Sequence, residues 1–315
     1  MLRNNKLTIA VDIGGSKLML GMVSREGEVI HKVKVPISCG ITAEQVIDII
    51  LSNVYAMKAQ FQGGVFDGVG VAIPGLADAD TGVWIYSCFS GIRDFNISGI
   101  LSEELKLPVF IGNDVNVCAM GEKIFGACRD DEDFVWITVS NGVGGGLVLN
   151  GRIYNGAFKN AGEIGHINVV ENGELCPCGN QGCLEAYASG VAIARRYRKE
   201  TAMDSEDARF AVSAKEIADM ARAGDKLASK IYHETGHFLG KAIASVANVV
   251  NPSKVILGGG VSMDMDLFID SLKSTVKREA FMEANRNLKI ERTALLYDAA
   301  LIGAAAMAQE RGNSI

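Results

Sequence analysis

The chain has 315 residues, about twice the length of a typical domain of ~150 residues, which predicts two domains. Its composition, 48% apolar and 22% charged, is typical of a folded globular protein and argues against disorder. The net charge of −6 gives no general reason to bind nucleic acid or an anionic membrane, and no apolar run approaches the ~18 residues of a membrane span. The chain runs from its start into an apolar strand without a signal pattern. We therefore expect a cytoplasmic protein without nucleic-acid or membrane partners.

Short apolar runs alternate with stretches of helical periodicity along the whole chain. The expected strands are 6–11, 18–23, 69–73, 109–111, 134–139, 147–149, 254–257 and 288–291. The expected helices are 43–60, 97–106, 115–125, 184–199, 213–223, 226–250, 264–280 and 299–309. This alternation predicts an α/β protein with mostly buried sheets.

Residues 9–23 and 137–149 share one pattern, in which a glycine-rich turn joins two apolar strands. The similarity indicates a weak internal duplication, with one copy in each half of the chain. Two related halves that each present a glycine turn predict a cleft that holds one ligand from both sides.

Three glycine-rich turns, at 12–17, 140–146 and 258–260, offer backbone amides to an anion such as phosphate. The sequence lacks both the Walker A pattern and a G-x-G-x-x-G motif that opens a helix. Each turn alone is also compatible with an ordinary hairpin, but three of them at strand ends favour phosphate binding. Asp12, beside Gly14 and Gly15, is typical of a carboxylate that serves Mg²⁺ next to a polyphosphate.

Asp114 follows a buried strand at the start of a helix, where open α/β sheets place their binding sites. Two interpretations are open at this point. As a helix cap, Asp114 accepts from free amides and stabilises the helix by ~1 kcal/mol. As a general base, it takes a proton from a substrate hydroxyl during phosphoryl transfer.

His166, Cys176, Cys178 and Cys183 form an H-x9-C-x-C-x4-C pattern. Three thiolates and an imidazole suit a closed, structural Zn²⁺ site, although unrelated buried thiols are the alternative. Disulfides are not expected. The remaining cysteines are predicted to be buried and inert; they are Cys39, Cys88, Cys118 and Cys128. The remaining histidines are predicted to lie on the surface or to take part in packing; they are His31, His233 and His237.

Six motifs, in this order and over essentially the full length, resemble the ROK family (repressor, open reading frame, kinase). They are Asp12-Ile-Gly-Gly-Ser-Lys17, Gly-Asn113-Asp114-Val-Asn116, Gly142-Val-Gly-Gly-Gly146, Ala-Gly-Glu163-Ile-Gly-His166, Cys176-Pro-Cys178-Gly-Asn-Gln-Gly-Cys183-Leu-Glu185 and Leu257-Gly-Gly-Gly260. The resemblance implies a two-domain actin-like ATPase (ribonuclease H-like) fold with a cleft between the domains. It also implies ATP- and Mg²⁺-dependent transfer of the γ-phosphoryl group to a sugar hydroxyl, usually O6 of a hexose, by a homodimer.

The resemblance also implies roles for individual residues. Asp114 corresponds to the general base, and the sugar contacts implied are Asn113, Glu163, His166 and Glu185. His166 then also serves as a zinc ligand, so the zinc loop positions part of the sugar pocket. The contacts implied for ATP and Mg²⁺ are Asp12, Gly14, Gly15, Ser16, Lys17, Asn141, Gly142, Gly144, Gly145, Gly258, Gly259 and Gly260. The expected domains are a smaller one, 1–117 with about 298–315, and a larger one, 118–297, with the zinc loop and the dimer helices.

The sequence departs from the family pattern in two places. Ser140-Asn141 replace the usual Gly-Thr before Gly142, and Asn141 can still donate to a phosphate. Cys88 and Ile92 stand where sugar kinases of the family carry an Asn that binds the sugar and a Trp. The lost hydrogen bond costs ~1–3 kcal/mol for a glucose-like ligand unless it is replaced, which predicts an unusual acceptor.

Two other functions are compatible with the resemblance. The family includes sugar-sensing transcription regulators, but only eleven residues precede Asp12 and the charge is −6, so we expect no DNA binding. A non-catalytic sugar binder is disfavoured by the presence of Asp114 and the glycine turns. Among acceptors, glucose, N-acetylmannosamine, N-acetylglucosamine, fructose, allose, a glycoside and a cyclitol remain open.

Overall fold

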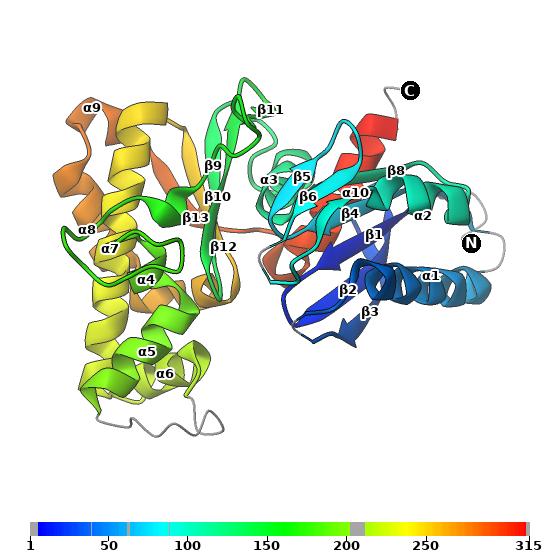
Figure 1. Ribbon diagram of the computed structural model, residues 1–315. Coiled ribbons are helices and arrows are strands. Elements are labelled where there is room, and N and C mark those ends of the chain that lie inside the picture. Colours follow the sequence, from blue (N-terminus) through cyan, green and yellow to red (C-terminus); the bar gives the residue numbers. More distant parts are fainter. Residues whose placement is uncertain (1–5, 39, 62–63, 88, 202–211, 313–315) are drawn as a thin grey trace. The chain divides into compact units, whose positions relative to one another are not determined.

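The computed structural model describes residues 6–38, 40–61, 64–87, 89–201 and 212–312 (Figure 1). The chain divides into two compact units. Unit 1 comprises Met1–Asp130, Asn155–Ala161 and Tyr297–Ile315, and unit 2 comprises Asp131–Tyr154 and Gly162–Leu296. The domain boundaries expected from the sequence, 1–117 with about 298–315 and 118–297, stay a prediction.

Unit 1 is built on a five-stranded mixed sheet in the order β3-β2-β1-β4-β8. The strands are β1 (Lys6–Ile13), β2 (Lys17–Ser24), β3 (Val29–Pro36), β4 (Val65–Ile73) and β8 (Val109–Asn113). β1, β2 and β3 pair antiparallel, whereas β1, β4 and β8 run parallel. A smaller sheet follows β4 and contains β5 (Leu76–Asp78), β6 (Val83–Tyr86) and β7 (Arg93–Phe95).

Helices cover both faces of the unit 1 sheet because successive side chains of a strand point to opposite faces. Ile9 and Val11 of β1 pack in one core with α1 (Ala43–Gln60) and α2 (Ile97–Leu105). Ala10, between them, packs with α3 (Asp114–Ile124) and α10 (Ala299–Gly312). The approach of α10 is so close that a Cβ at Gly70 would collide with the carbonyl oxygen of Ala304. The last helix of the chain is therefore part of the unit that begins it.

Unit 2 repeats the same sheet topology in the order β11-β10-β9-β12-β13. Its strands are β9 (Phe134–Val139), β10 (Val143–Leu149), β11 (Arg152–Ile153), β12 (Lys254–Gly258) and β13 (Lys289–Arg292). In both sheets a hairpin of the first two strands continues into parallel pairing, which agrees with the internal duplication inferred from the sequence.

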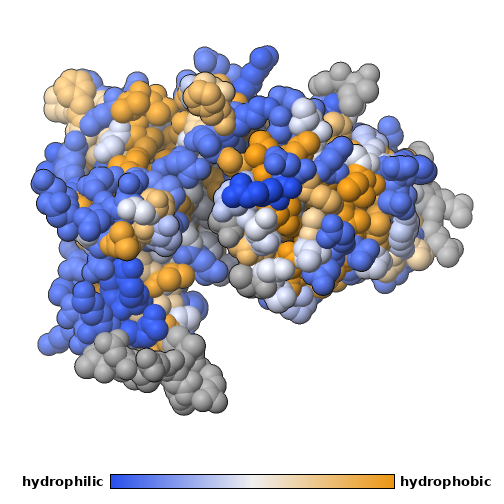
Figure 2. All heavy atoms as spheres, viewed as in Figure 1, coloured by the Kyte–Doolittle hydropathy of each residue, from blue (hydrophilic) through white to orange (hydrophobic). Residues whose placement is uncertain are grey.

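The helical part of unit 2 packs around the long helix α7 (Lys226–Val250). Its other helical segments are η1 (Ile164–His166), α4 (Glu185–Ala188), α5 (Gly190–Glu200), α6 (Ala214–Arg222), η3 (Gly260–Leu267), α8 (Ile269–Glu279) and α9 (Met282–Asn285). A short turn of 3₁₀ helix, η4 (Leu296–Asp298), leads into α10. Polar residues gather on the visible face over α5 and α6, whose buried positions include Ile193 and Ile217 (Figure 2). Within the described ranges, none of the helices combines the length and apolar character needed to cross a bilayer.

The structure corrects the expected elements in several places. The helix expected over 184–199 is two helices, because Ser189 is extended (φ −67°, ψ 157°) and caps α5 through its hydroxyl. The segment expected to begin a helix at 264 is 3₁₀ helix up to Leu267, and α8 starts at Ile269. The strands of 29–36 and of the β5–β7 sheet were not expected, since β3 is an edge strand with alternating charged residues and the others are short.

Candidate functional site

Two carboxylates lie at the same edge of the unit 1 sheet. Asp12 pairs in register with Ala72 of β4, which in turn pairs with Gly112 of β8. β8 ends at Asn113 and α3 starts at Asp114, so Asp114 lies just beyond the level of Asp12, with one strand between them. At ~4.8 Å per strand spacing, the two strands that carry these residues lie roughly 10 Å apart. The parallel topology thus brings together two acids that are far apart in sequence.

Burial shifts the acidity of both carboxylates. It raises the pKa of Asp12 to about 6, with a smaller opposing effect of the Lys17 charge. Burial, together with the charge of Asp12, raises the pKa of Asp114 to about 7. A carboxyl group with a pKa near neutrality suits acid–base chemistry at physiological pH, because it accepts and releases a proton readily there.

Asn113, rather than Asp114, is the cap of α3. Its Oδ1 accepts hydrogen bonds from the backbone amides of Val115 (3.0 Å) and Asn116 (3.2 Å). Its Nδ2 donates to the Gly75 carbonyl (3.0 Å) and to Asp114 Oδ1 (3.1 Å). The Val115 amide is also within 3.0 Å of Asp114 Oδ1. The cap of α3 is therefore chiefly Asn113. The role of Asn113 as a sugar contact stays a prediction, and its side-chain amide already has the partners named above.

The first glycine turn spans the residues between β1 and β2. The Gly14 amide donates to the Lys17 carbonyl (2.9 Å), and the Ile37 amide holds the Ser16 carbonyl (3.0 Å). Gly15, Ser16 and Lys17 are exposed. The turn is thus fixed by its backbone while its outer surface stays accessible to a ligand.

The two other glycine turns lie together in unit 2, at the carboxyl ends of neighbouring parallel strands. Gly258 at the end of β12 pairs in register with Thr138 near the end of β9. The turn after β9 is shorter than expected, because Gly144, Gly145 and Gly146 are part of β10 and pair with β9. Only residues 140–142 form the turn itself, with Ser140 and Asn141 exposed. An ATP contact at Gly144 and Gly145 stays a prediction.

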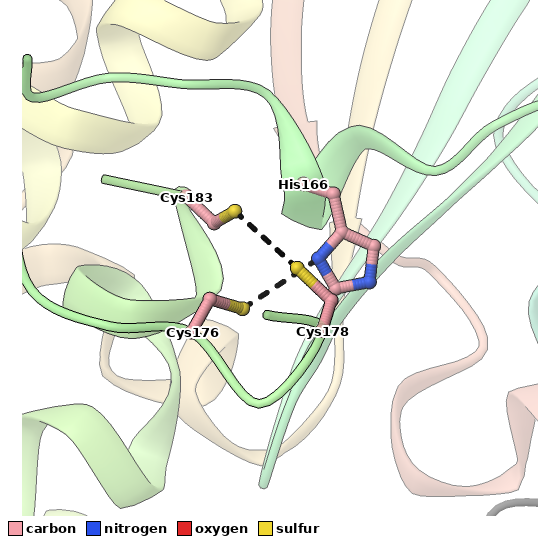
Figure 3. A group of neighbouring side chains, drawn as sticks. All are labelled: His166, Cys176, Cys178 and Cys183. Atoms are coloured by element: carbon pink, nitrogen blue, oxygen red, sulfur yellow. Dashed lines mark hydrogen bonds between the residues drawn. The ribbon is translucent and has the colours of Figure 1, made fainter. Parts of the chain in front are cut away.

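The four predicted metal ligands converge in unit 2 (Figure 3). One ligand atom from each of His166, Cys176, Cys178 and Cys183 lies within 4.8 Å of all the others. The distances are 3.7 Å from Cys176 Sγ to His166 Nδ1 and 3.7 Å from Cys178 Sγ to Cys183 Sγ. Zn–S bonds of about 2.3 Å in a tetrahedron separate two sulfurs by about 3.8 Å. The donor types and their spacing therefore fit Zn²⁺.

The cluster is assembled by tight backbone turns. The Gly179 amide donates to the Cys176 carbonyl (2.9 Å), and the Cys176 amide donates to the Asn180 carbonyl (2.8 Å). Cys176 and Cys183 are buried, whereas Cys178 is exposed. Among the other cysteines, Cys118 and Cys128 are buried as predicted. Cys39 and Cys88 lie outside the described residues, and Ile92 is buried in the unit 1 core.

The remaining predicted sugar contacts flank this cysteine–histidine cluster. Glu163 is exposed and precedes η1, and its Oε2 lies 3.9 Å from His166 Nε2, the ring nitrogen that faces away from Cys176. Glu185 follows Cys183 by two residues and is half-buried at the start of α4. Its Oε2 accepts a hydrogen bond from the Val143 amide (2.9 Å).

Two backbone groups that shape these sites were not predicted from the sequence. The Gly75 carbonyl anchors Asn113, and the Gly190 amide holds the Ser140 carbonyl at 2.7 Å. The Pro74-Gly75 pair after a strand was visible as a turn signal, but its partner 38 residues away was not. Two histidines outside the cluster take part in packing, as predicted. His31 lies against Phe61, and His237 Nδ1 lies 3.1 Å from Thr275 Oγ1.

Comparison with known proteins agrees with this architecture. The profile of the ROK family matches residues 8–311. The chain is 33% identical to a glucokinase of Halalkalibacterium halodurans over 98% of this chain and 96% of that protein. It is similar in structure to a ROK family glucokinase of Streptomyces griseus in complex with glucose and AMPPNP (TM-score 0.83, 32% identity, 96% and 99% of the two chains). It is also 34% identical to the DNA-binding transcriptional dual regulator NagC of Escherichia coli, over 76% of this chain and 59% of NagC.

The two sheets of equal topology and their glycine turns thus define an α/β protein of the actin-like ATPase fold, as in the ROK sugar kinase structures. Within that class, the chain belongs to the ROK family.

Proposed function

We propose that this protein transfers the γ-phosphoryl group of ATP to O6 of a hexose or a hexose-like acceptor, with Asp114 as the general base. The class of enzyme, a sugar kinase, follows from similarity to glucokinases over nearly the whole chain. The observation that carries the base assignment is a half-buried carboxylate with a pKa of about 7 on a helix that Asn113 already caps.

In this mechanism Asp114 removes the proton from the acceptor hydroxyl as its oxygen attacks the γ-phosphorus. The bond between the γ-phosphorus and the bridging oxygen of ADP breaks, and the proton then leaves Asp114 for solvent. The hydrogen bonds from Val115 and Asn113 both end on Oδ1, so we assign Oδ2 to the substrate proton. Without such a base, phosphoryl transfer of this kind slows by about 10²–10⁴-fold.

The nucleotide is proposed to bind at the backbone amides of the glycine turns, which suit phosphate oxygens. In unit 1 these are Gly14, Gly15, Ser16 and Lys17. In unit 2 they are Asn141, Gly142 and the run Gly258–Gly260, which lie at the ends of adjacent strands. Asp12 offers a carboxylate oxygen, the donor that Mg²⁺ takes together with phosphates and water, and Mg²⁺ bound there neutralises phosphate charge.

We further propose that the cysteine cluster holds a structural Zn²⁺ that orients the sugar contacts. Four protein ligands leave no open position on the metal, so its contribution is to fix the loop. His166 Nδ1 faces the sulfurs, which leaves Nε2, beside Glu163, to contact the sugar. Removal of the metal then releases the sugar contacts as well as the loop. By analogy with the family, we also propose that the protein forms a homodimer. The same analogy gives a smaller domain, 1–117 with about 298–315, and a larger one, 118–297.

A coupled assay of ADP release over a panel of sugars tests the activity. We expect turnover with at least one six-carbon sugar or close analogue, and no product from its 6-deoxy counterpart. Asp114→Asn is the matched control, since it keeps the size of the side chain and the Oδ1 acceptor. Turnover of Asp114→Asn close to the wild type would overturn the base assignment, and turnover of the 6-deoxy sugar would overturn O6.

The similarity to NagC favours one alternative, a sugar-sensing regulator. The chain spans 59% of NagC, so the DNA-binding function of that protein is not carried over by the match alone. A gel-shift titration against mixed-sequence DNA, with and without sugar, distinguishes the two. Sugar-dependent retardation without ADP release would favour the regulator.

A further inference from the structure

The turn 140–142, which the proposed function assigns to ATP phosphates, is held in place by Glu185 and Gly190, which follow the cysteine cluster in the chain. The Val143 amide donates to Glu185 Oε2 (2.9 Å), and the Ser140 carbonyl accepts from the Gly190 amide (2.7 Å). Within the turn, the Ser140 amide donates to the Gly142 carbonyl (2.8 Å). The contacts from Glu185 and Gly190 fix both ends of the turn. The contact from Glu185 is made by a side chain, whereas that from Gly190 is made by the backbone.

Glu185 is placed for this contact by the metal cluster. It follows Cys183 after a single residue, and the Leu184 amide between them donates to the Ile167 carbonyl (2.9 Å), next to His166. The backbone that carries Glu185 is therefore tied to the segment next to His166, and its carboxylate is tied to the turn. A glycine at position 142 leaves room for this carboxylate, because a Cβ there would lie 2.6 Å from Glu185 Oε2.

We propose that Glu185 is a positioning residue for the nucleotide: its carboxylate holds the 140–143 backbone in the conformation that receives a phosphate. The other oxygen, Oε1, remains for a sugar hydroxyl, and one side chain then links the two substrate sites. This inference rests on the proposed function, because it needs the turn to bind ATP.

Nucleotide binding in the absence of any sugar separates this role from a sugar contact. We would titrate AMPPNP with Mg²⁺ into the wild type and into Glu185→Gln, Glu185→Asp and Glu185→Ala by calorimetry. Glutamine keeps an oxygen at the same reach, so its Kd should stay within about threefold of the wild type. Aspartate keeps the charge but is shorter by one methylene, and alanine removes the acceptor, so both should raise the Kd about tenfold.

Gly142→Ala supplies an independent perturbation of the same contact. Its Cβ pushes the carboxylate away and should also weaken AMPPNP binding about tenfold. In the Glu185→Ala background the clash is gone, so Gly142→Ala should add less than about twofold. Full additivity of the two substitutions would overturn the proposal, because it would mean that they act through separate contacts.

The outcomes for the two proposals are distinct. If the wild type fails to bind AMPPNP, the proposed function is wrong. If the wild type binds and all Glu185 variants bind equally well without sugar, Glu185 serves the sugar alone and the inference is wrong. An order in which Asp binds better than Gln would also overturn it, since charge rather than reach would then matter. Because Asp and Gln are compared with each other, the test holds even where Glu185→Ala does not fold.

Discussion

The same burial that suits Asp114 to the proposed role of a base should also make its ionised form unfavourable for the stability of the fold. Its pKa rises from 3.8 in the unfolded chain to about 7 because of burial and the charge of Asp12. The folded protein therefore binds more protons than the unfolded one between about pH 4 and 7, and stability falls across that range as the pH rises. Above about pH 7 the penalty is complete. Asp114→Asn removes it and should raise stability while it abolishes most activity.

The size of the effect follows from the shift. About three pKa units at about 1.4 kcal/mol each set an upper limit of roughly 4 kcal/mol. We expect a gain of about 1–2 kcal/mol, since Asp114 is only half-buried and the asparagine keeps only part of the hydrogen bonding. The cap of α3 is unaffected, because Asn113 supplies it through two amide contacts.

Thermal unfolding of both proteins at pH 5 and pH 8, beside the kinase assay, measures this prediction. The stabilisation should be larger at pH 8, and turnover should fall by about 10²–10⁴-fold. Asp48→Asn, which changes an exposed carboxylate on α1, is the control and should alter neither quantity. An Asp114→Asn protein that is less stable than the wild type at pH 8, or equally stabilised at both pH values, would refute the reasoning.

Three further predictions concern the pH profile, the metal and the core. The value of kcat/KM should rise through about pH 7 as Asp114 loses its proton, and this limb should move to lower pH in Asp12→Asn; a limb that stays in place contradicts the coupling of the two acids. Metal analysis of protein purified without chelator should find zinc, and Cys183→Ser should lower both zinc content and sugar affinity, whereas Cys128→Ala should leave the zinc content unchanged. Gly70→Ala should lower the free energy of unfolding by about 1–3 kcal/mol, because its Cβ meets the Ala304 carbonyl. A denaturant titration measures both variants. Gly312→Ala in α10 should change the free energy of unfolding by less than about 0.5 kcal/mol, and an effect as large as that of Gly70→Ala would argue against the close packing at Gly70.

The class of fold, the family and the group of one histidine and three cysteines could all be predicted from the sequence. Strand and helix periodicities are local, so the alternation of elements was readable, and α7 was predicted over its observed range of 226–250. The cluster was readable as well, because three of its ligands lie within eight residues and tight turns bring such residues together. The repeated strand–turn–strand pattern likewise indicated the shared topology of the two sheets.

The contacts between polar groups, in contrast, could be read only from the folded chain. From the sequence, Asp114 is compatible with a helix cap or a base, and the structure shows that Asn113 Oδ1 accepts from the two amides of the cap. The limits of the glycine turn at 140–142 depend on pairing of β10 with β9, and its support by Glu185 spans 42 residues. The charge of Asp12 acts on Asp114 across the sheet, although 102 positions separate them in the sequence. Hydrogen bonds and charge interactions between residues remote in sequence leave no periodic pattern, and for that physical reason they appear only once the chain is folded.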